Sequence, residues 1–400
     1  MNTIMIVAGE SSGELYGSLL AKALRKRWPD VNLIGVGGER MKEAGVALVS
    51  HITDAFGLVE AVSSLKKIKT AFDSCIDAIQ RSMPEVLVLI DYPDFNLRLA
   101  KTAKALGIKI LYYVSPQVWA WRSGRVKKIA SLVDRMAVIL PFEEKIYSNA
   151  GLKCEFVGHP ILEEIEAILG PEGPTPFHSG RRTNIKSALG FDPDRPLLAI
   201  LPGSRPSELN RHLPLMVNVI RQIIGDAGIL SEKPLQICMP LAPNTDEERY
   251  GNYLEALKRE GVTVTKGETV KILAASDMAL VTSGTATLQT AFLEVPMVVV
   301  YKLSPLTYQL GKRIIKVRHI SLVNILSGRE VVAELIQHRA NPKEIINELK
   351  KIMSDGNYRE AMLESCRRIK EPFTGKRASE RVAEIIMEMA GPFGMKKDEA

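Results

Sequence analysis

The chain has few cysteines and no long run of uncharged apolar residues. Its four cysteines are far apart among 400 residues and form no Cys-x-x-Cys pair, so neither a disulfide framework nor a zinc site is indicated. The most apolar window, residues 129–142, contains Asp134 and Arg135 and falls short of the about 18 uncharged residues that a membrane-spanning helix requires. We therefore expect buried thiols and no transmembrane helix.

Several signatures of common enzyme classes are also absent. The sequence has no Gly-x-x-x-x-Gly-Lys-Ser/Thr, His-Glu-x-x-His or Gly-x-Ser-x-Gly, which excludes P-loop NTPases, zincins and serine hydrolases of the usual kinds. The only close Asp-x-Asp, residues 192–194, contains Pro193 and predicts a turn, so no metal or other cofactor is expected. The first residues lack a basic stretch, and Glu10 interrupts them too early for a signal peptide, so a cytosolic protein is expected.

Positive charge is concentrated in two segments. The formal net charge is +7, and residues 95–133 contain eight bases and no acid, while residues 295–329 contain six bases and no acid. Basic segments of this kind suit phosphate groups, nucleic acid or an anionic membrane surface. A solvated helix face is the commoner meaning of any one such run, so the charge alone leaves these interpretations open.

Apolar runs typical of buried strands alternate with amphipathic stretches in both halves of the chain, which predicts α/β domains with parallel sheets. A length of 400 residues exceeds what one core usually holds. The Gly- and Pro-rich residues 170–180 are the predicted boundary, so one domain covers residues 1–170 and the other residues 181–374. Residues 342–390 are predicted to be helical, with no strand after them.

Ligands of open α/β sheets bind at the carboxyl ends of the strands, and two loops there in the second half fit a diphosphate. Ser283 and Gly284 follow an apolar run, and Thr285 begins a helical pattern whose first amides could seat an anion. A hydroxyl cap on a structural helix is the alternative. In residues 201–205, Leu-Pro-Gly-Ser-Arg, Arg205 could bind two phosphate oxygens and stabilise a leaving group without a metal. A surface arginine in a turn is the alternative.

Two loops of the first half carry carboxylates. Residues 8–14, Ala-Gly-Glu-Ser-Ser-Gly-Glu, do not match the dinucleotide fingerprint, and their acids would repel a pyrophosphate. A hydroxylated ligand is therefore expected there, with a glycine turn that starts a helix as the alternative. In residues 90–96, Asp94 could take a proton from a sugar hydroxyl. An aspartate that caps a helix beside Pro93 is the more frequent meaning of this pattern.

Taken together, seven motifs resemble those of the lipid-A-disaccharide synthase family, and they occur in the family's order between Ile4 and approximately Gln337. The motifs are AGESSGE, IDYPDFN, YYVSPQVWAWR, FVGHPILEE, LPGSR, SGTATLQTAFLEVPMVVVYK and NILSGREVVAELIQ. The string VSPQVWAWR is far more specific than a glycine turn. The resemblance implies an inverting, metal-independent glycosyltransferase of the GT-B fold with two Rossmann-like domains. The first domain would bind the acyl-sugar acceptor and be joined by the C-terminal helix, residues 375–400, and the second would bind the UDP-sugar.

The reaction implied by this resemblance transfers the glucosaminyl unit of UDP-2,3-diacylglucosamine to the 6-hydroxyl of 2,3-diacylglucosamine 1-phosphate. It forms the β-1,6 disaccharide of lipid A biosynthesis and releases UDP. Because both substrates carry acyl chains, the implied location is cytoplasmic and peripheral, on the inner face of a Gram-negative cytoplasmic membrane. The anionic surface of that membrane is an expected partner, nucleic acid is not, and the oligomeric state is left open, with a homodimer among the expected forms.

By position in the family motifs, Asp94 is implied as the general base, and Arg205 as the group that neutralises the departing UDP. Gln289 stands where the family commonly has a glutamate that accepts hydrogen bonds from the ribose. It lies on the same helical face as Thr285, so weaker ribose binding is expected. The implied substrate-binding residues are Glu10, Ser12, Gly13, Ser204, Ser283, Gly284, Thr285, Gln289, Asn324 and Arg329.

Residues 54–72 place apolar side chains beside three lysines, which predicts an acyl-binding or membrane-docking segment. An amphipathic helix packed on the first domain is an equally good interpretation. Trp119 and Trp121 could line an acyl or sugar site, although core packing is the default for tryptophan. The other residues indicated for this role are Phe56, Leu58, Val59, Val62, Lys66, Lys67 and Lys69.

The nearest alternatives are other UDP-sugar enzymes of the GT-B fold, such as a UDP-N-acetylglucosamine 2-epimerase or the glucosaminyl transferase of peptidoglycan synthesis. The string VSPQVWAWR argues against both. A non-catalytic nucleotide-sugar sensor or membrane adaptor is the alternative from another class. The presence of both Asp94 and Arg205 disfavours it.

Overall fold

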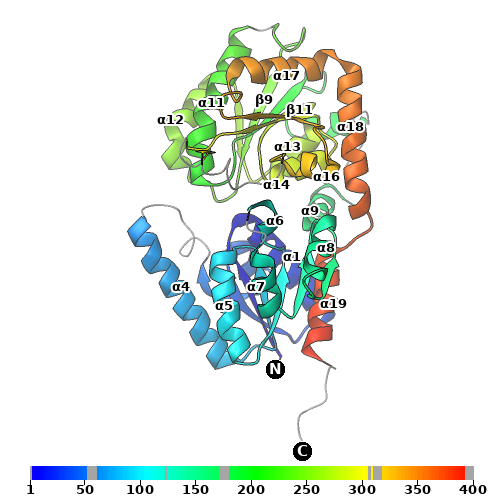
Figure 1. Cartoon of the computed structure of the whole chain (residues 1–400). Helices are drawn as coiled ribbons and strands as arrows, with labels where there is room; N and C mark the ends of the chain where they lie inside the picture. The colour runs from blue at the N-terminus through cyan, green and yellow to red at the C-terminus, as the bar shows by residue number, and fades with distance from the viewer. Residues whose placement is uncertain are drawn as a thin grey trace, which may run out of the picture. The chain divides into compact units, whose positions relative to one another are not determined.

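The computed structural model describes residues 2–51, 61–121, 124–170, 180–226, 228–304, 308–309 and 318–391, and for residues 61–67 and 120–121 the backbone alone. The chain forms two compact units, Met1–Pro160 with Phe373–Ala400, and Ile161–Pro372 (Figure 1). Each unit is an α/β fold around a parallel sheet, which confirms the predicted fold class. The boundary lies after Pro160 rather than after residue 170, because nearly all of helix α9 (Pro160–Leu169) belongs to the second unit.

The sheet of the first unit has seven parallel strands in the described residues, in the order β3-β2-β1-β4-β5-β6-β7. Its central strands β1 and β4 are buried along their whole length, as the continuous apolar sequences of a sheet covered on both faces require. The strands are β1 (Thr3–Ala8), β2 (Asn32–Gly37), β3 (Ala47–His51), β4 (Val86–Ile90), β5 (Lys109–Tyr113), β6 (Arg135–Val138) and β7 (Cys154–Phe156).

Helices cover both faces of this sheet. Met5, Leu87 and Ile110 point into a core shared with α4, α5, α7 and α8. Because side chains alternate along a strand, their neighbours face the other side, where α1 and α19 pack together. The helices are α1 (Ser11–Arg27), α2 (Glu39–Glu43), α4 (Ala61–Ser82), α5 (Pro93–Ala105), α6 (Val118–Trp121), α7 (Arg125–Leu132), α8 (Pro141–Ser148) and α19 (Ala378–Ala390).

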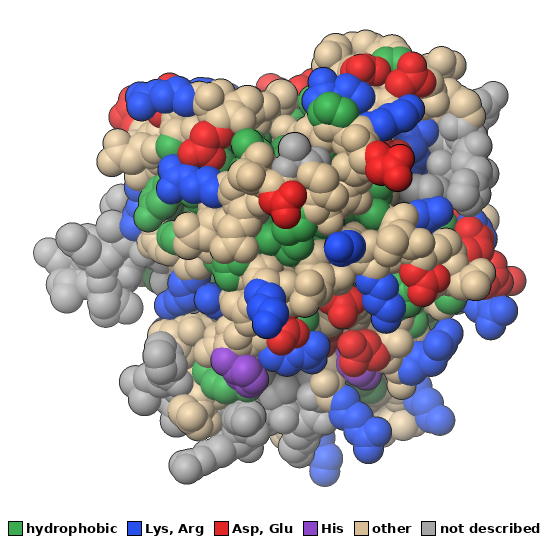
Figure 2. Space-filling view, turned by 90° about the horizontal axis from the view of Figure 1, so that it is seen from above, with side chains coloured by type: hydrophobic (Ala, Val, Ile, Leu, Met, Phe, Trp, Pro, Cys, Tyr) green, Lys and Arg blue, Asp and Glu red, His purple; other side chains and the backbone are tan. Residues whose placement is uncertain are grey.

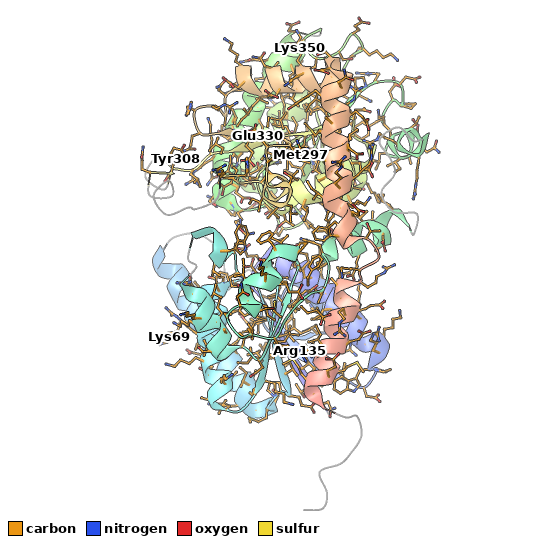
Figure 3. The ribbon with its side chains drawn as sticks, turned by 45° about the vertical axis from the view of Figure 1, so that its right-hand side comes forward. Lys69, Arg135, Met297, Tyr308, Glu330 and Lys350 are labelled. Atoms are coloured by element: carbon orange, nitrogen blue, oxygen red, sulfur yellow. The ribbon has the colours of Figure 1, made fainter. Side chains whose placement is uncertain are left out.

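The last helix, α19, is attached to the first unit by ion pairs. The Arg381 guanidinium donates to both carboxylate oxygens of Glu155, with 2.9 Å between Nη2 and Oε2. Arg135, labelled in Figure 3, donates to Glu388 on this helix. These hydrogen bonds lower the pKa values of Glu155 and Glu388 below the usual range. The chain therefore returns from the second unit, and its last helix packs as part of the first unit.

The sheet of the second unit has the strand order β10-β9-β8-β11-β12-β13, and all its pairs are parallel. Its strands are β8 (Leu197–Leu201), β9 (Gln236–Leu241), β10 (Thr263–Lys266), β11 (Met278–Thr282), β12 (Met297–Tyr301) and β13 (Ala333–Ile336). Besides α9, its helices include α10 (Gly180–Ala188), α11 (Pro206–Gly225), α12 (Glu247–Arg259), α13 (Thr269–Ala275), α14 (Thr285–Phe292), α16 (Leu322–Ser327), α17 (Pro342–Ser354) and α18 (Gly356–Lys370). The short helix η1 (Glu371–Phe373) follows α18.

Each sheet has one point at which the strand order reverses. In the first unit this point lies between β1 and β4, and in the second it lies between β8 and β11. The loops that follow two such strands diverge to opposite faces of the sheet and leave a crevice between them, which is where open α/β folds bind their ligands. The four loops that the sequence indicated follow these four strands.

Charged side chains of both signs are mixed on one face of the molecule. Figure 2 shows lysine and arginine interspersed with aspartate and glutamate on the face that it presents. Within the described part of the chain, no helix combines the length and the apolar character that crossing a bilayer demands.

Candidate active site

The turn after β4, which leads to Asp94, has a constrained backbone. Asp91 and Tyr92 have φ values of +51° and +41°, in the left-handed region that side chains other than glycine rarely adopt. The buried Asn96 amide donates to the Asp91 carbonyl oxygen at 2.7 Å and to that of the preceding residue at 3.2 Å. The Tyr112 hydroxyl also donates to the Asp91 carbonyl. These bonds offset a conformational cost of about 1–3 kcal/mol per strained residue and hold the turn in one shape.

Asp94 lies in the first turn of α5, with its side chain toward solvent. The N-cap position of this helix is Tyr92, and no side-chain cap hydrogen bond is formed there, so the interpretation of Asp94 as the helix cap is wrong. The Asp94 side chain is 70% exposed, and its Oδ1 accepts a hydrogen bond from Arg125 Nη1 at 2.9 Å. A carboxylate that is accessible and oriented by a guanidinium can accept a proton from a bound hydroxyl.

The loop after β1 packs against this turn. A Cβ built at Gly9 would lie 2.4 Å from the Cβ of Tyr92, so the two loops can meet only because residue 9 is glycine. Glu10 occupies the N-cap position of α1 without a side-chain cap bond, and Ser12 and Gly13 follow in the first turn. The fold thus brings Glu10, Ser12 and Gly13 to the same sheet edge as the β4 turn.

Glu143 is a candidate that the sequence pattern did not reveal. It follows β6, next along the sheet from β5, and its side chain is buried. Its Oε1 accepts from Ser115 Oγ at 2.6 Å and from Trp119 Nε1 at 2.9 Å, and its Oε2 accepts from the Leu140 backbone nitrogen at 3.3 Å. Burial raises the pKa of Glu143 to about 7. The available signal was an acid at the start of the helix that follows a strand, in Pro-Phe-Glu.

In the second unit, the loop after β8 orients Arg205. Gly203 has φ +106°, and a Cβ there would lie 2.6 Å from Glu208 Oε2, so this turn requires glycine. Glu208, which no sequence motif indicated, accepts hydrogen bonds from the backbone nitrogens of Ser204 at 3.0 Å and Arg205 at 3.3 Å. Its Oε1 accepts from Arg205 Nη1 at 3.0 Å, while the arginine side chain stays 48% exposed. The guanidinium is oriented and remains accessible to an anion.

The segment Ser283–Thr285 lies beside that loop, because β8 and β11 are neighbouring strands. The N-cap of α14 is Gly284, with no side-chain cap bond, so the interpretation of a hydroxyl cap is wrong. The Ser283 hydroxyl instead donates to the Ile320 carbonyl oxygen at 2.9 Å. A Cβ built at Gly284 would meet no described atom within 4 Å. The start of α14 therefore has the room and the positive end of a helix dipole that an anion needs.

Two other predicted residues make contacts within the second unit. Gln289 Nε2, on α14, donates to Glu164 Oε2, on α9, at 3.1 Å. A carboxylate thus lies next to the position where the family commonly has glutamate. No sequence pattern predicts this contact, because the two residues are far apart in the chain. The exposed Arg329 donates from Nη2 to Ser365 Oγ, on α18, at 3.1 Å.

Asn324 is buried and its hydrogen-bonding capacity is filled. Its Nδ2 donates to Glu334 Oε1 at 2.8 Å and to the Val332 carbonyl oxygen at 2.9 Å. Its Oδ1 accepts from the backbone nitrogens of Val331 at 2.7 Å and Val332 at 3.0 Å. Since a carboxamide has two donors and two acceptor positions, the expected direct contact with a nucleotide has no group left to use. Asn324 instead supports the turn that precedes β13.

Most of the predicted acyl-binding or membrane segment lies outside the described residues. Lys69 is described, and it is exposed on α4 (Figure 3). Trp119 is half-buried, with its ring edge-on to Phe142 at 4.9 Å between centroids. Outside the description are the residues Phe56, Leu58 and Val59 and the side chains of Val62, Lys66, Lys67 and Trp121.

Comparison with known proteins gives one family over nearly the whole chain. Residues 4–387 match the family described as lipid-A-disaccharide synthetase. The lipid-A-disaccharide synthase of Trichlorobacter lovleyi is 40% identical over 390 residues, which cover 96% of this chain and 97% of the relative. That of Syntrophus aciditrophicus is 41% identical over 388 residues, with 96% and 97% covered.

Solved structures resemble the chain in fold. The UDP-GlcNAc 2-epimerase of Neisseria meningitidis, bound to UDP-GlcNAc, superposes with a TM-score of 0.68 at 11% identity and covers 97% of this chain and 100% of its own. MurG of Acinetobacter baumannii gives a TM-score of 0.53 at 12% identity, with 97% and 100% covered. At these identities the similarity establishes the GT-B fold and nothing about the substrate.

Proposed function

Because this chain belongs to the lipid-A-disaccharide synthetase family, we propose that it joins UDP-2,3-diacylglucosamine to 2,3-diacylglucosamine 1-phosphate and releases UDP. The family makes it a glycosyltransferase that forms lipid A disaccharide. The relatives at about 40% identity are synthases, whereas the epimerase resembles the chain at 11% identity. The epimerase and non-catalytic adaptor alternatives are therefore not favoured.

The observation that supports this proposal most directly is the pair of charged groups at the two points where the strand order reverses. One has an exposed carboxylate, Asp94, held by Arg125. The other has an exposed guanidinium, Arg205, beside the uncapped start of α14. A transfer from a UDP-sugar needs a base for the acceptor hydroxyl and positive charge for the departing diphosphate. Each unit supplies one of these requirements.

The proposed reaction is a single displacement. Asp94 takes the proton of the acceptor 6-hydroxyl as that oxygen bonds to the anomeric carbon of the donor. The bond from this carbon to the diphosphate oxygen breaks, and Arg205 with the first amides of α14 stabilises the charge that develops there. Attack from the side opposite the leaving group inverts the anomeric carbon. These protein groups supply the positive charge that a divalent ion supplies in other transferases, so we propose that no metal is needed.

A single incubation tests the proposal. Purified protein is mixed with acylated UDP-glucosamine and acylated glucosamine 1-phosphate in the presence of EDTA, and the products are identified by mass spectrometry. The expected products are the acylated disaccharide 1-phosphate and UDP. Conversion of the UDP-sugar to an epimer, or no turnover of these two substrates, would contradict the proposed reaction. Activity that EDTA abolishes would contradict only the metal-free mechanism.

We propose that Glu164 and Gln289 together replace the single glutamate that the family commonly uses at the ribose. In Gln289→Glu two carboxylates would lie about as close as the present 3.1 Å contact, and like charges at that distance repel. We expect this variant to bind UDP about 2–10-fold more weakly. The double variant Glu164→Gln with Gln289→Glu restores one carboxylate and one amide, and should bind UDP as the wild type does. Isothermal titration measures both affinities.

Gln222→Glu, an exposed change on α11, is the matched control for added negative charge. A double variant that binds UDP as weakly as Gln289→Glu alone would rule out the exchange of roles between the two positions.

We also propose that the enzyme binds an anionic membrane peripherally through bases of the first unit. Helix α5 packs against both α4 and α7, and the exposed bases of these three helices include Lys69, Arg98, Lys101, Lys127 and Lys128. Each base near such a surface contributes about 1 kcal/mol. Changing Lys69, Arg98 and Lys101 to serine should therefore lower the affinity for phosphatidylglycerol vesicles by about 100-fold. Sedimentation with the vesicles measures this affinity.

Three exposed lysines of the second unit, changed together to serine, give the control for net charge: Lys233, Lys258 and Lys350. Equal losses in the two triple variants would show that total charge, and not this surface, governs binding.

A further inference from the structure

The segment Ser115–Trp119, which follows β5, forms several side-chain contacts with helix α8. Glu143 Oε1 accepts hydrogen bonds from both ends of the segment, from Ser115 Oγ at 2.6 Å and Trp119 Nε1 at 2.9 Å. The Tyr147 hydroxyl donates to the Pro116 carbonyl oxygen at 3.3 Å. Trp119 also packs edge-on against Phe142. One carboxylate therefore defines the position of the serine and of the tryptophan ring together.

This segment is connected to Asp94 by the sheet and by the helix that follows it. Ile90 pairs with Tyr113, so the turns after β4 and β5 lie side by side at the carboxyl edge. Helix α7 begins soon after Trp119, and its first residue, Arg125, donates to Asp94 at 2.9 Å. A shift of the segment would therefore move the tryptophan ring and the guanidinium that orients the proposed base.

We propose that Glu143 is a positioning residue, which holds Trp119 and the 115–119 turn in the arrangement that binds the acceptor sugar beside Asp94. The inference rests on the proposed transferase function and concerns the acceptor side of the same site. Glu143 acts through Ser115 and Trp119, since its own carboxylate is buried. The half-buried Trp119 ring has the flat apolar face on which sugars stack.

The protonation state of Glu143 changes the number of hydrogen bonds that it can accept. When ionised, it accepts from Ser115, Trp119 and the Leu140 backbone at once. When it is protonated, one of its oxygens carries a hydrogen and becomes a donor itself. This hydrogen then needs an acceptor, although the groups around it are the donors of the three bonds. Burial raises its pKa to about 7, so both states are populated near neutral pH.

Three titratable groups from the surrounding described elements interact with Glu143. Asp91, in the β4 turn, raises the pKa of Glu143 further. Tyr147, on α8, and Cys154, on β7, have pKa values raised by burial, the latter to about 12, so both are neutral around pH 7. Of these groups, Glu143 is therefore the one to which a transition near that pH is assigned.

The sign of the stability effect follows from the raised pKa. The folded protein binds this proton more tightly than the unfolded chain does between about pH 4.5 and about pH 7. The contribution of Glu143 to stability is therefore complete below about pH 4.5 and is lost as the pH rises through about 7. Glu143→Gln, which does not titrate, removes this part of the pH dependence.

Steady-state kinetics of Glu143→Gln test the proposal. Glutamine keeps the volume but has only one acceptor oxygen, so one of the donors loses its partner. At pH 8 we expect the acceptor KM to rise about 10-fold, with the donor KM and the UDP affinity unchanged. The inflection near pH 7 in kcat/KM for the acceptor should disappear in this variant. A pH-dependent change in the fluorescence emission of Trp119, which the Trp119→Phe variant lacks and so identifies, should disappear with it. Glu144→Gln, the same change at the neighbouring residue, is the matched control and should behave as the wild type.

The possible outcomes separate the two levels of the proposal. If the wild type forms no disaccharide, the proposed function fails. If the wild type is active and Glu143→Gln has the same acceptor KM and the same pH profile, the positioning role fails while the function stands. If Glu143→Gln does not fold, Trp119→Phe removes one donor and leaves the carboxylate, and it must raise the acceptor KM selectively. The absence of a selective rise in Trp119→Phe would also overturn the inference.

Discussion

Asp94→Ala is expected to lower kcat by about 10²–10⁴-fold, the usual contribution of a positioned base. The proton of the acceptor hydroxyl would then have to leave to water as the new bond forms. UDP affinity should be unchanged, because Asp94 lies in the first unit and the proposed nucleotide residues lie in the second. Release of UDP at saturating concentrations of both substrates measures kcat, and titration with UDP measures the affinity.

Asp94→Asn distinguishes the base from other contributions of this side chain. It keeps the volume and a hydrogen-bond acceptor for Arg125, and removes the basic oxygen. Loss of the helix-dipole interaction at this position would cost about 0.3–1 kcal/mol of stability, which thermal unfolding reports separately. Asp73→Asn, an exposed change on α4, is the control for loss of charge. Near wild-type kcat in Asp94→Asn would show that another group takes the proton.

Arg205→Ala is the second change with a large expected effect, a loss of about 10²–10³-fold in kcat. The guanidinium is proposed to stabilise the charge that develops on the diphosphate in the transition state. The UDP product carries that charge as well, so UDP should also bind more weakly. Arg205→Lys retains a positive charge without the planar pair of donors and should recover only part of the activity.

Arg211→Ala provides the matched control, because Arg211 is an exposed arginine of α11, the helix that begins directly after Arg205, and its side chain donates only within that helix in the described structure. Glu208 forms an ion pair with the Arg205 guanidinium and accepts hydrogen bonds from the backbone amides of Ser204 and Arg205. Full activity in Arg205→Ala, with Arg211→Ala also unchanged, would remove the guanidinium from the mechanism.

The sequence predicted the fold and the four loops because both depend on local patterns. Continuous apolar runs such as residues 86–90 specify buried parallel strands, and small or hydroxylated residues after them specify the turns. Gly9 and Gly203 are in these motifs because a side chain would collide with Tyr92 and with Glu208. Asp94 and Arg205 could be named for the same reason, since each directly follows a recognisable strand.

The predictions that needed correction concern contacts across the chain. Asn324 was expected at the nucleotide, and it is instead enclosed by the backbone and carboxylate of the turn before β13. The domain boundary was expected in the Gly- and Pro-rich segment, but helix α9 packs with the second unit. Composition identifies a Gly- and Pro-rich segment, and it carries no information on which core a neighbouring amphipathic helix joins.

What the sequence determined by itself was therefore the family, the α/β architecture and the carboxyl-edge position of the loops, because strand periodicity and turn chemistry are readable within a few residues. What only the tertiary structure decided was which carboxylates accept hydrogen bonds from the candidate side chains: Glu143 from Trp119, Glu208 from Arg205 and Glu164 from Gln289. An acid on a helix looks like a solvated residue in any sequence. Its role depends on burial and on partners that the packing of strands and helices brings within hydrogen-bonding distance.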